Sequence, residues 1–215
     1  LVVLPLISPH GITVLASTAK SQFGGSWTLQ KNHSGIETEI SACKYSVSFL
    51  NGTTKTKCFP RLASSLCNLN CRIADEMYFC GVISNRYVRA YTNVYPSKGV
   101  FANLNGTVNG NKVRIYVDAY SWSSSSNSAS ELYKDLNCAM KNPSALSRME
   151  NTAKFDGHNI TVSTYNGLDF YLYECYHFVE FVGVSNNEEI IVYIVGINAS
   201  VSQVEALVSN VMSCV

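Results

Sequence analysis

The chain has 215 residues, of which 47% are hydrophobic, 11% aromatic and only 14% charged, with a formal net charge of +1. An average soluble domain has about 25% charged residues, so Ser, Thr, Asn and Tyr must supply most of the polar surface here. This composition excludes a disordered chain, and the near-zero net charge argues against nucleic acid or an anionic membrane surface as a partner.

Residues 1–22 form an apolar N-terminal tail. Pro5 and Pro9 interrupt the tail, and proline is incompatible with a continuous helix or a central strand. We therefore expect short extended pieces before Pro9 and at 12–16. A hinge at 23–25, with sequence Phe-Gly-Gly, should separate the tail from the rest of the chain.

Residues 23–120 are predicted to be a β-rich region. β-Branched and aromatic runs are separated there by Asn-Gly, Pro-Ser and glycine-rich breaks, which is typical of strands joined by turns. The clearest alternation puts three apolar side chains on one face of a strand and Arg114, Tyr116 and Asp118 on the other. The predicted strands cover 27–30, 44–50, 77–83, 87–95 and 113–120, and a short helix is expected within 60–76.

Residues 121–215 are predicted to be an α+β region, with a soft boundary in the serine-rich stretch 121–130. Ser200 and Gln203 form a capping box that should open a final amphipathic helix ending near residue 214. The other predicted elements are helices at 129–141 and from residue 143, strands at 159–165 and 168–182 joined by an Asn-Gly turn, and a strand at 189–196. The predicted fold is thus mainly β: an antiparallel β-rich head with a few packed helices, an α+β C-terminal part and an extended N-terminal tail strand.

Eight cysteines indicate an oxidising compartment, because secreted chains use cysteines as bridges whereas cytosolic chains seldom keep so many thiols. A zinc site would need paired CxxC or CxxH spacings, and the closest pair here is CxxxC with no second close pair. We interpret all eight as disulfide cysteines, with zinc and free thiols as the alternatives. Five precede the serine-rich stretch and three follow it, so complete pairing requires a bridge between the two regions. They are Cys43, Cys58, Cys67, Cys71, Cys80, Cys138, Cys175 and Cys214.

Five sequons could carry N-linked glycans, which would hydrate a charge-poor surface. Asn51 and Asn105 are each followed by glycine, so we expect both at hairpin-like turns and glycosylated. The five acceptors are Asn32, Asn51, Asn105, Asn159 and Asn198. The chain starts at Leu1, which we interpret as following a removed signal peptide, and no run of about 18 apolar residues predicts a transmembrane helix. The expected location is extracellular or at the cell surface.

No catalytic, cofactor-binding or metal-binding motif is recognisable, so we expect neither an enzyme nor a cofactor. Strand alternation would put Cys175, His177 and Val179 on one face, where a Cys/His pair is either a reactive or metal-binding couple or a bridged cysteine beside a hydrogen-bonded histidine. We favour the second interpretation. Thirteen tyrosines also permit a carbohydrate-binding site, although sheet propensity explains them equally well.

An apolar tail, a glycine hinge, a charge-poor β-rich head and several sequons together resemble the subunits of archaeal surface filaments that assemble by donor-strand complementation. The resemblance implies a secreted, glycosylated pilus or thread subunit that forms a homopolymer, with its tail inserted into a neighbouring sheet. Deleting residues 1–17 should then leave a folded head. The implied interface residues are Leu1, Val2, Val3, Leu4, Leu6, Ile7, Ile12, Val14 and Leu15. The alternatives are a monomeric secreted adhesin or glycan-binding module whose tail packs on its own head and, less favoured, a secreted hydrolase.

Overall fold

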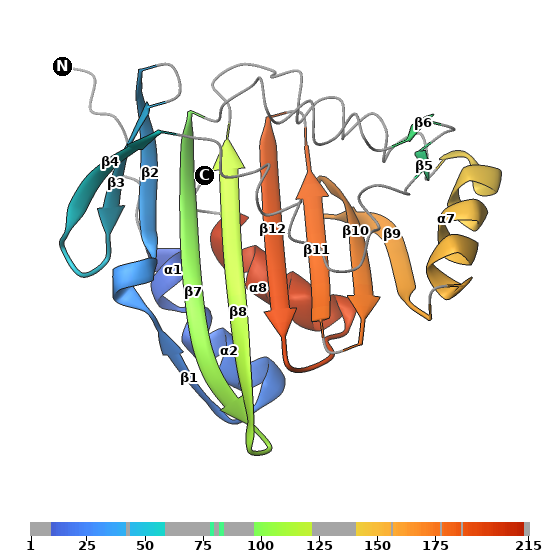
Figure 1. Ribbon diagram of the computed structural model, residues 1–215, viewed down its shortest axis with the longest axis horizontal. Coiled ribbons are helices and arrows are strands. Elements are labelled where there is room, and N and C mark those ends of the chain that lie inside the picture. Colours follow the sequence, from blue (N-terminus) through green and yellow to red (C-terminus); the bar gives the residue numbers. More distant parts are fainter. Residues whose placement is uncertain are drawn as a thin grey trace.

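The described residues of the computed structural model build one large antiparallel sheet with three helices packed on one face and a fourth, α7, beside an edge strand (Figure 1). The structure describes residues 10–41, 44–58, 78–79, 82–83, 97–121, 141–155, 157–176, 178–185 and 187–212. The strand order is β4-β3-β2-β7-β8-β12-β11-β10-β9, and β1 also pairs with β7. Because β8 pairs with β12, the sheet is continuous between the regions before and after residue 121. The prediction of a mainly β fold with packed helices is confirmed.

The strands have the following bounds: β1 Ser26–Leu29, β2 Gly35–Ser41, β3 Lys44–Phe49, β4 Thr54–Cys58, β7 Lys98–Val108, β8 Asn111–Ser121, β9 Asn159–Tyr165, β10 Leu168–Cys175, β11 Phe178–Val184 and β12 Glu188–Val195. A separate two-stranded sheet pairs β5 (Tyr78–Phe79) with β6 (Val82–Ile83). The helices are α1 His10–Thr13, α2 Leu15–Phe23, α7 Pro143–Phe155 and α8 Val201–Met212, with a 3-10 turn, η1, at Lys31–His33. None of the described helices is both long and apolar enough to cross a membrane.

The main core lies between the sheet and the helices α1, α2 and α8, which lie behind the sheet in Figure 1. Alternate residues of β8, Val113, Ile115 and Val117, are at most 1% exposed, as their alternation predicts. Ile115 and Val117 belong to the same core cluster as Val204 and Leu207 of α8, both fully buried. The predicted capping box is present: the Gln203 amide donates to the Ser200 hydroxyl over 3.3 Å, and the Ser200 amide donates to the Gln203 side chain over 2.9 Å.

The prediction of an extended segment at 12–16 is wrong, because this segment is helical in α1 and α2. Ile12, Leu15 and Ala19 recur at helical spacing and are fully buried in the chain's own core. The apolar run was interpreted as a strand, but its three deepest side chains share one helix face. Packing against α8 therefore decides the conformation. Residues 1–9 lie outside the described residues.

Side-chain hydrogen bonds also hold α2 to α8. The Asn210 amide donates to the Thr18 hydroxyl over 2.6 Å, and the Gln203 side chain donates to the Gln22 carbonyl over 2.8 Å. The glycine pair that follows α2 joins it directly to β1. Helix α2 also contacts both β1 and α8. Residues 10–23 are thus an integral part of the head.

The predicted single strand at 168–182 is two strands, β10 and β11, which pair with each other. The chain reverses at Tyr176, which has a φ of 51°. A left-handed conformation at a bulky residue is unusual, and the sequence carries no glycine or Asn-Gly signal at this turn. The reversal puts Cys175 opposite Phe178, so the predicted shared face of Cys175 and Val179 does not exist. His177 lies outside the described residues.

The sheet face turned away from α2 and α8, called the polar face below, has a different composition. Cross-strand register aligns Tyr173, Glu180, Tyr193, Tyr116 and Asn103 across five neighbouring strands on this face. Alternation in each strand puts these polar side chains on the face opposite the main core. Towards β10–β12 that face also carries buried apolar side chains, among them Val182, Val184 and Ile191. The candidate site lies on this second face.

Candidate binding groove on the polar face

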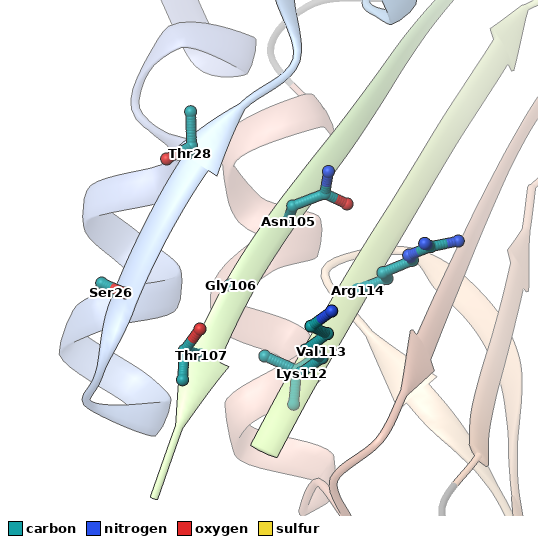
Figure 2. Close-up of a pocket in the computed structure, with 8 residues that line it drawn as sticks. All are labelled: Ser26, Thr28, Asn105, Gly106, Thr107, Lys112, Val113 and Arg114. Atoms are coloured by element: carbon teal, nitrogen blue, oxygen red, sulfur yellow. The ribbon is translucent and has the colours of Figure 1, made fainter. Parts of the chain in front are cut away.

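A groove of about 400 Å³ runs over β1, β7 and β8 on the polar face. Figure 2 shows the polar side chains that line it, with the helices behind the strands; Val113, which also lines it, is buried on the core side of β8. Asn105 lies between Thr28 of β1 and Arg114 of β8, which are its cross-strand partners. Thr107 lies in the same way between Ser26 and Lys112. The groove is lined by Ser26, Thr28, Asn105, Gly106, Thr107, Lys112, Val113 and Arg114.

Strand β1 packs closely against β7 and forms one wall of the groove, and at two positions there is no room for a side chain larger than that of glycine. A Cβ atom at Gly106 would lie 2.5 Å from the Trp27 ring, and one at Gly25 would lie 2.1 Å from the Thr107 carbonyl oxygen. Gly25 also has a φ of +71°, which favours glycine. The Trp27 indole donates to the Gly24 carbonyl over 2.9 Å, which ties the ring to the end of α2. The groove therefore depends on the buried N-terminal helices.

The groove is basic. Lys112 and Arg114 are both exposed, and the one ion pair within the described part of the chain is between Lys57 and Glu37. Neither cation has a carboxylate partner among the described residues, and in Figure 2 the Arg114 side chain, at the rim of the groove, extends from β8 away from β7. Ser26, Thr28, Thr107 and Asn105 add hydroxyl and amide groups that both donate and accept hydrogen bonds. This arrangement fits a ligand that carries an acidic group among several hydroxyls.

The sequons differ in local structure, although all five acceptor asparagines are exposed. Asn51 lies in a tight turn, where its side-chain oxygen accepts from the Thr53 amide over 3.0 Å and the Thr53 hydroxyl over 2.7 Å. The predicted turn position of Asn105 is wrong: it lies within β7, and the turn follows at Asn109 and Gly110. An Asn-Gly pair can also lie inside a long strand. Here strand β7 continues through Asn105 and Gly106 because β1 and β8 pair with it on both sides.

The other three sequons are tied to structure by different contacts. Ser34, the third residue of the Asn32 sequon, is fully buried, and its hydroxyl accepts from the Asn103 amide over 3.0 Å. Asn159 begins the edge strand β9. Asn198 precedes α8, whose N-terminus is capped by its sequon partner Ser200.

Cys175 forms a disulfide. Cys58 is the last residue of β4. The six other predicted disulfide cysteines lie outside the described residues: Cys43, Cys67, Cys71, Cys80, Cys138 and Cys214.

The histidine beside Cys175 is His158, which the sequence did not indicate because it lies 17 residues away along the chain. His158 is 9% exposed, and its Nε2 is 3.2 Å from the Cys175 sulfur. Its Nδ1 is hydrogen-bonded to the hydroxyl of Tyr173, and the two rings are perpendicular. A bridged sulfur is no nucleophile, so the arrangement is a buried polar contact.

Glu180 is fully buried on the polar face. Burial raises the pKa of its carboxyl to about 8, and the Tyr193 hydroxyl opposes this shift. Neither carboxyl oxygen accepts a hydrogen bond of normal geometry from the described part of the chain, and desolvation prevails over the tyrosine. Within the part of the chain that the structure describes, no group of three or more His, Cys, Asp or Glu residues is arranged to hold a metal ion.

The structure also places the residues of the predicted subunit interface. Ile12 and Leu15 are fully buried in their own head, and Val14 is half-buried between α1 and α2. The remaining predicted interface residues belong to 1–7 and lie outside the described residues. The groove residues Ser26, Thr28 and Lys112 were not predicted, although the alternation of β8 did assign Arg114 to the outer face. Comparisons with protein-family models, curated proteins and solved structures find no match for this chain.

Proposed function

We propose that this chain is an extracellular binding module that recognises an acidic glycan through the groove over β1, β7 and β8. The observation that carries the proposal is the pair of exposed cations, Lys112 and Arg114, set beside Thr28, Asn105 and Thr107 on one rigid sheet. The disulfide at Cys175 supports an extracellular location, because bridges persist in oxidising compartments.

The chemistry of the groove fits an acidic sugar. A guanidinium group makes strong, paired hydrogen bonds to a carboxylate, and an ammonium group adds a point charge. Hydroxyl and amide side chains match the hydroxyl groups of a sugar, because each side can donate or accept. The shallow, open shape also suits a chain that lies across the surface.

The packing of residues 10–23 supports a module that is complete in one chain. A tail exchanged between subunits would have to leave its own head, and Ile12 and Leu15 would then expose their buried surface. This cost favours the tail-on-own-head alternative over insertion of the whole segment 1–17 into a neighbour.

The test compares a galacturonic acid hexasaccharide with neutral cellohexaose by isothermal titration calorimetry. The uronate should bind measurably and cellohexaose at least tenfold more weakly. Arg114→Ala and Lys112→Ala should each weaken uronate binding by about threefold to tenfold, as expected for loss of a charge-assisted contact. Lys20→Ala removes the same charge from the exposed side of α2 and should change nothing. Equal binding by the Arg114→Ala variant would refute the groove as the site.

A second candidate is a filament subunit that adds residues 1–9 as a strand to a neighbour. The supporting observation is β9, an edge strand with no charged residue, whereas the opposite edge strand β4 carries Lys55 and Lys57. Lysines protect a sheet edge from pairing, so β9 is the more receptive edge. However, α7 contacts β9 and would have to move aside for pairing along its full length (Figure 1). Negative-stain electron microscopy tests this candidate: filaments that disappear on deletion of residues 1–9 would establish it over the monomeric module.

A further inference from the structure

A second hollow, of about 240 Å³, opens on the polar face beside the groove. It lies over β2, β3, β4 and the first half of β7, with His33 of η1 at its rim. Its lining residues are His33, Glu37, Val47, Phe49, Lys55, Lys57, Phe101 and Asn103. The hollow thus combines two aromatic rings with two lysines.

The rings hold the lysines in place. The Lys55 ammonium lies over the Phe49 ring at 5.2 Å, and the Lys57 ammonium lies over the Phe101 ring at 5.9 Å. The two rings contact each other edge to face at 5.7 Å. Each lysine therefore has a cation–π partner that restricts its otherwise flexible side chain. Lys57 is also paired with Glu37, which is 1% exposed, so Lys55 supplies the cation available to a ligand.

The groove and the hollow are neighbours along one strand. Asn105 lines the groove and Asn103 lines the hollow, and both project from the polar face of β7. Asn103 and Asn105 are about 7 Å apart along the strand, but Lys55 lies three strands from β7 and level with Gly99. About 20 Å along the strands and about 14 Å across them therefore separate Lys55 from Asn105, a span that needs a chain of about five or six sugars. Two carboxylates lie near this path: Glu37 in the lining of the hollow, paired with Lys57, and Asp118 of β8, the cross-strand partner of Phe101.

We propose that the groove and the hollow are subsites of one extended site for an acidic oligosaccharide that crosses the sheet from β8 over β7 to β4. The groove binds one acidic unit through Lys112 and Arg114, and the hollow binds another through Lys55. This inference rests on the proposed function and adds the length of the ligand and the position of its second charge.

The hollow suits a sugar better than a nucleic acid base. Proteins that bind single strands offer open aromatic faces on which bases stack. Here Phe101 is only 4% exposed, and a lysine covers each ring. The ammonium groups remain as the recognition elements, and they bind carboxylates.

The test measures the affinity of the full chain for galacturonic acid disaccharide and hexasaccharide by calorimetry. The hexasaccharide should bind wild type at least tenfold more tightly than the disaccharide. Lys55→Gln should weaken hexasaccharide binding about threefold to fivefold, the size of a surface ion pair, and leave disaccharide binding unchanged. Lys55→Arg, which retains the charge, should restore hexasaccharide affinity. Lys55 is exposed on an edge strand, so these variants should fold.

The outcomes separate the two proposals. Equal hexasaccharide affinity for wild type and Lys55→Gln would overturn the extended site, while Arg114→Ala still tests the groove by its loss of disaccharide binding. A single-stranded oligonucleotide of the same charge should bind at least tenfold more weakly than the hexasaccharide. If it binds equally well, the surface is a general anion site and the inference fails.

Discussion

Glu180 is a residue whose environment decides its protonation. Its carboxyl has no exposed surface, lies between Tyr173 and Tyr193 across the sheet, and has a pKa raised to about 8 by burial. In the unfolded chain this group titrates near the ordinary value of 4.5. At neutral pH the folded protein therefore holds a proton that the unfolded chain releases.

The sign of the pH effect follows from this difference. Below pH 4.5 Glu180 is protonated in both the folded and the unfolded state. As the pH rises toward 8, Glu180 ionises in the unfolded state but not in the folded state. This ionisation stabilises the unfolded state, so the free energy of unfolding falls. Each unit of the shift is worth roughly 1.4 kcal/mol. We predict that Glu180→Gln flattens this decline and makes the protein more stable than wild type at pH 8.

Urea denaturation at several pH values measures the effect. Tyr193→Phe is the matched variant, because the tyrosine hydroxyl lowers the pKa of Glu180 and its loss should extend the decline to higher pH. A wild-type stability that rises steadily between pH 5 and 8, and parallels that of Glu180→Gln, would contradict the assignment.

Asn105 has two possible roles that exclude each other. As the acceptor of its sequon it would carry a glycan, and as a groove residue it would contact the ligand. A glycan attached between Thr28 and Arg114 would fill the groove. We predict that protein made in a glycosylating host and modified at Asn105 does not bind oligogalacturonate, whereas protein made in a bacterial periplasm does.

Glycopeptide mass spectrometry of the bound and unbound fractions from an oligogalacturonate column checks this prediction. Modified Asn105 should be confined to the unbound fraction. Asn51, which lies in a turn outside the groove, should be modified equally in both fractions and serves as the internal control. Equal modification of Asn105 in the two fractions would show that its glycan leaves the groove open.

At the scale of elements, the contact of β1 with β7 forms the groove. A methyl group at Gly106 would lie 2.5 Å from the Trp27 ring, so Gly106→Ala must push β1 away. We predict a loss of about 1–3 kcal/mol in the free energy of unfolding, typical of overpacking, together with weaker glycan binding. The sequon survives this change, so glycosylation at Asn105 should persist. Gly110→Ala tests the neighbouring turn, where a Cβ would have open space but the φ of +81° is unfavourable; it should cost stability without weakening binding.

The N-terminal helices give the second prediction about elements. Leu15 is fully buried, so Leu15→Ala should cost about 2–5 kcal/mol, whereas Lys20→Ala on the exposed side should have little effect. Deletion of residues 1–17 should therefore unfold the head, contrary to the expectation from the sequence, and deletion of 1–9 should not. Thermal denaturation followed by circular dichroism measures both. A stable 1–17 deletion would contradict the packing of α1 and α2.

Elements with strong local signals were predictable from the sequence, and those decided by distant contacts were not. The alternation of β8 and the capping box of α8 are local, and both predictions are confirmed. By contrast, the helical state of 10–23 depends on α8 at the far end of the chain. The turn between β10 and β11 has a tyrosine at positive φ, which no turn rule anticipates.

For the whole molecule, the near-zero net charge conceals a segregation of charge across the sheet. The four strands β9 to β12 carry five acidic residues, Asp169, Glu174, Glu180, Glu188 and Glu189, and no Lys or Arg. The cations near the groove lie on β8, next to β12, and those of the hollow lie on β4 at the opposite edge of the sheet. A count of charges along the sequence cannot reveal this pattern, because it arises from strand order.

Only part of the candidate site was predictable from the sequence. The outward face of β8 was predictable, and with it Arg114. The alignment of Arg114 with Thr28 was not, because it also requires β1 to pair with β7, and that pairing joins residues far apart in the chain. The pairing of β7 with β8 is a local hairpin. The buried contact between His158 and Cys175 was missed for the same reason.

The central claim is that an acidic glycan binds the polar face along β1, β7 and β8. Titration of the ¹⁵N-labelled chain with galacturonic acid disaccharide, followed by NMR chemical-shift perturbation, tests it directly. The account predicts saturable shifts centred on Thr28, Asn105 and Arg114, with the amides of α2 and α8 on the opposite face unchanged. The absence of shifts, or shifts centred on α2 and α8, would contradict it.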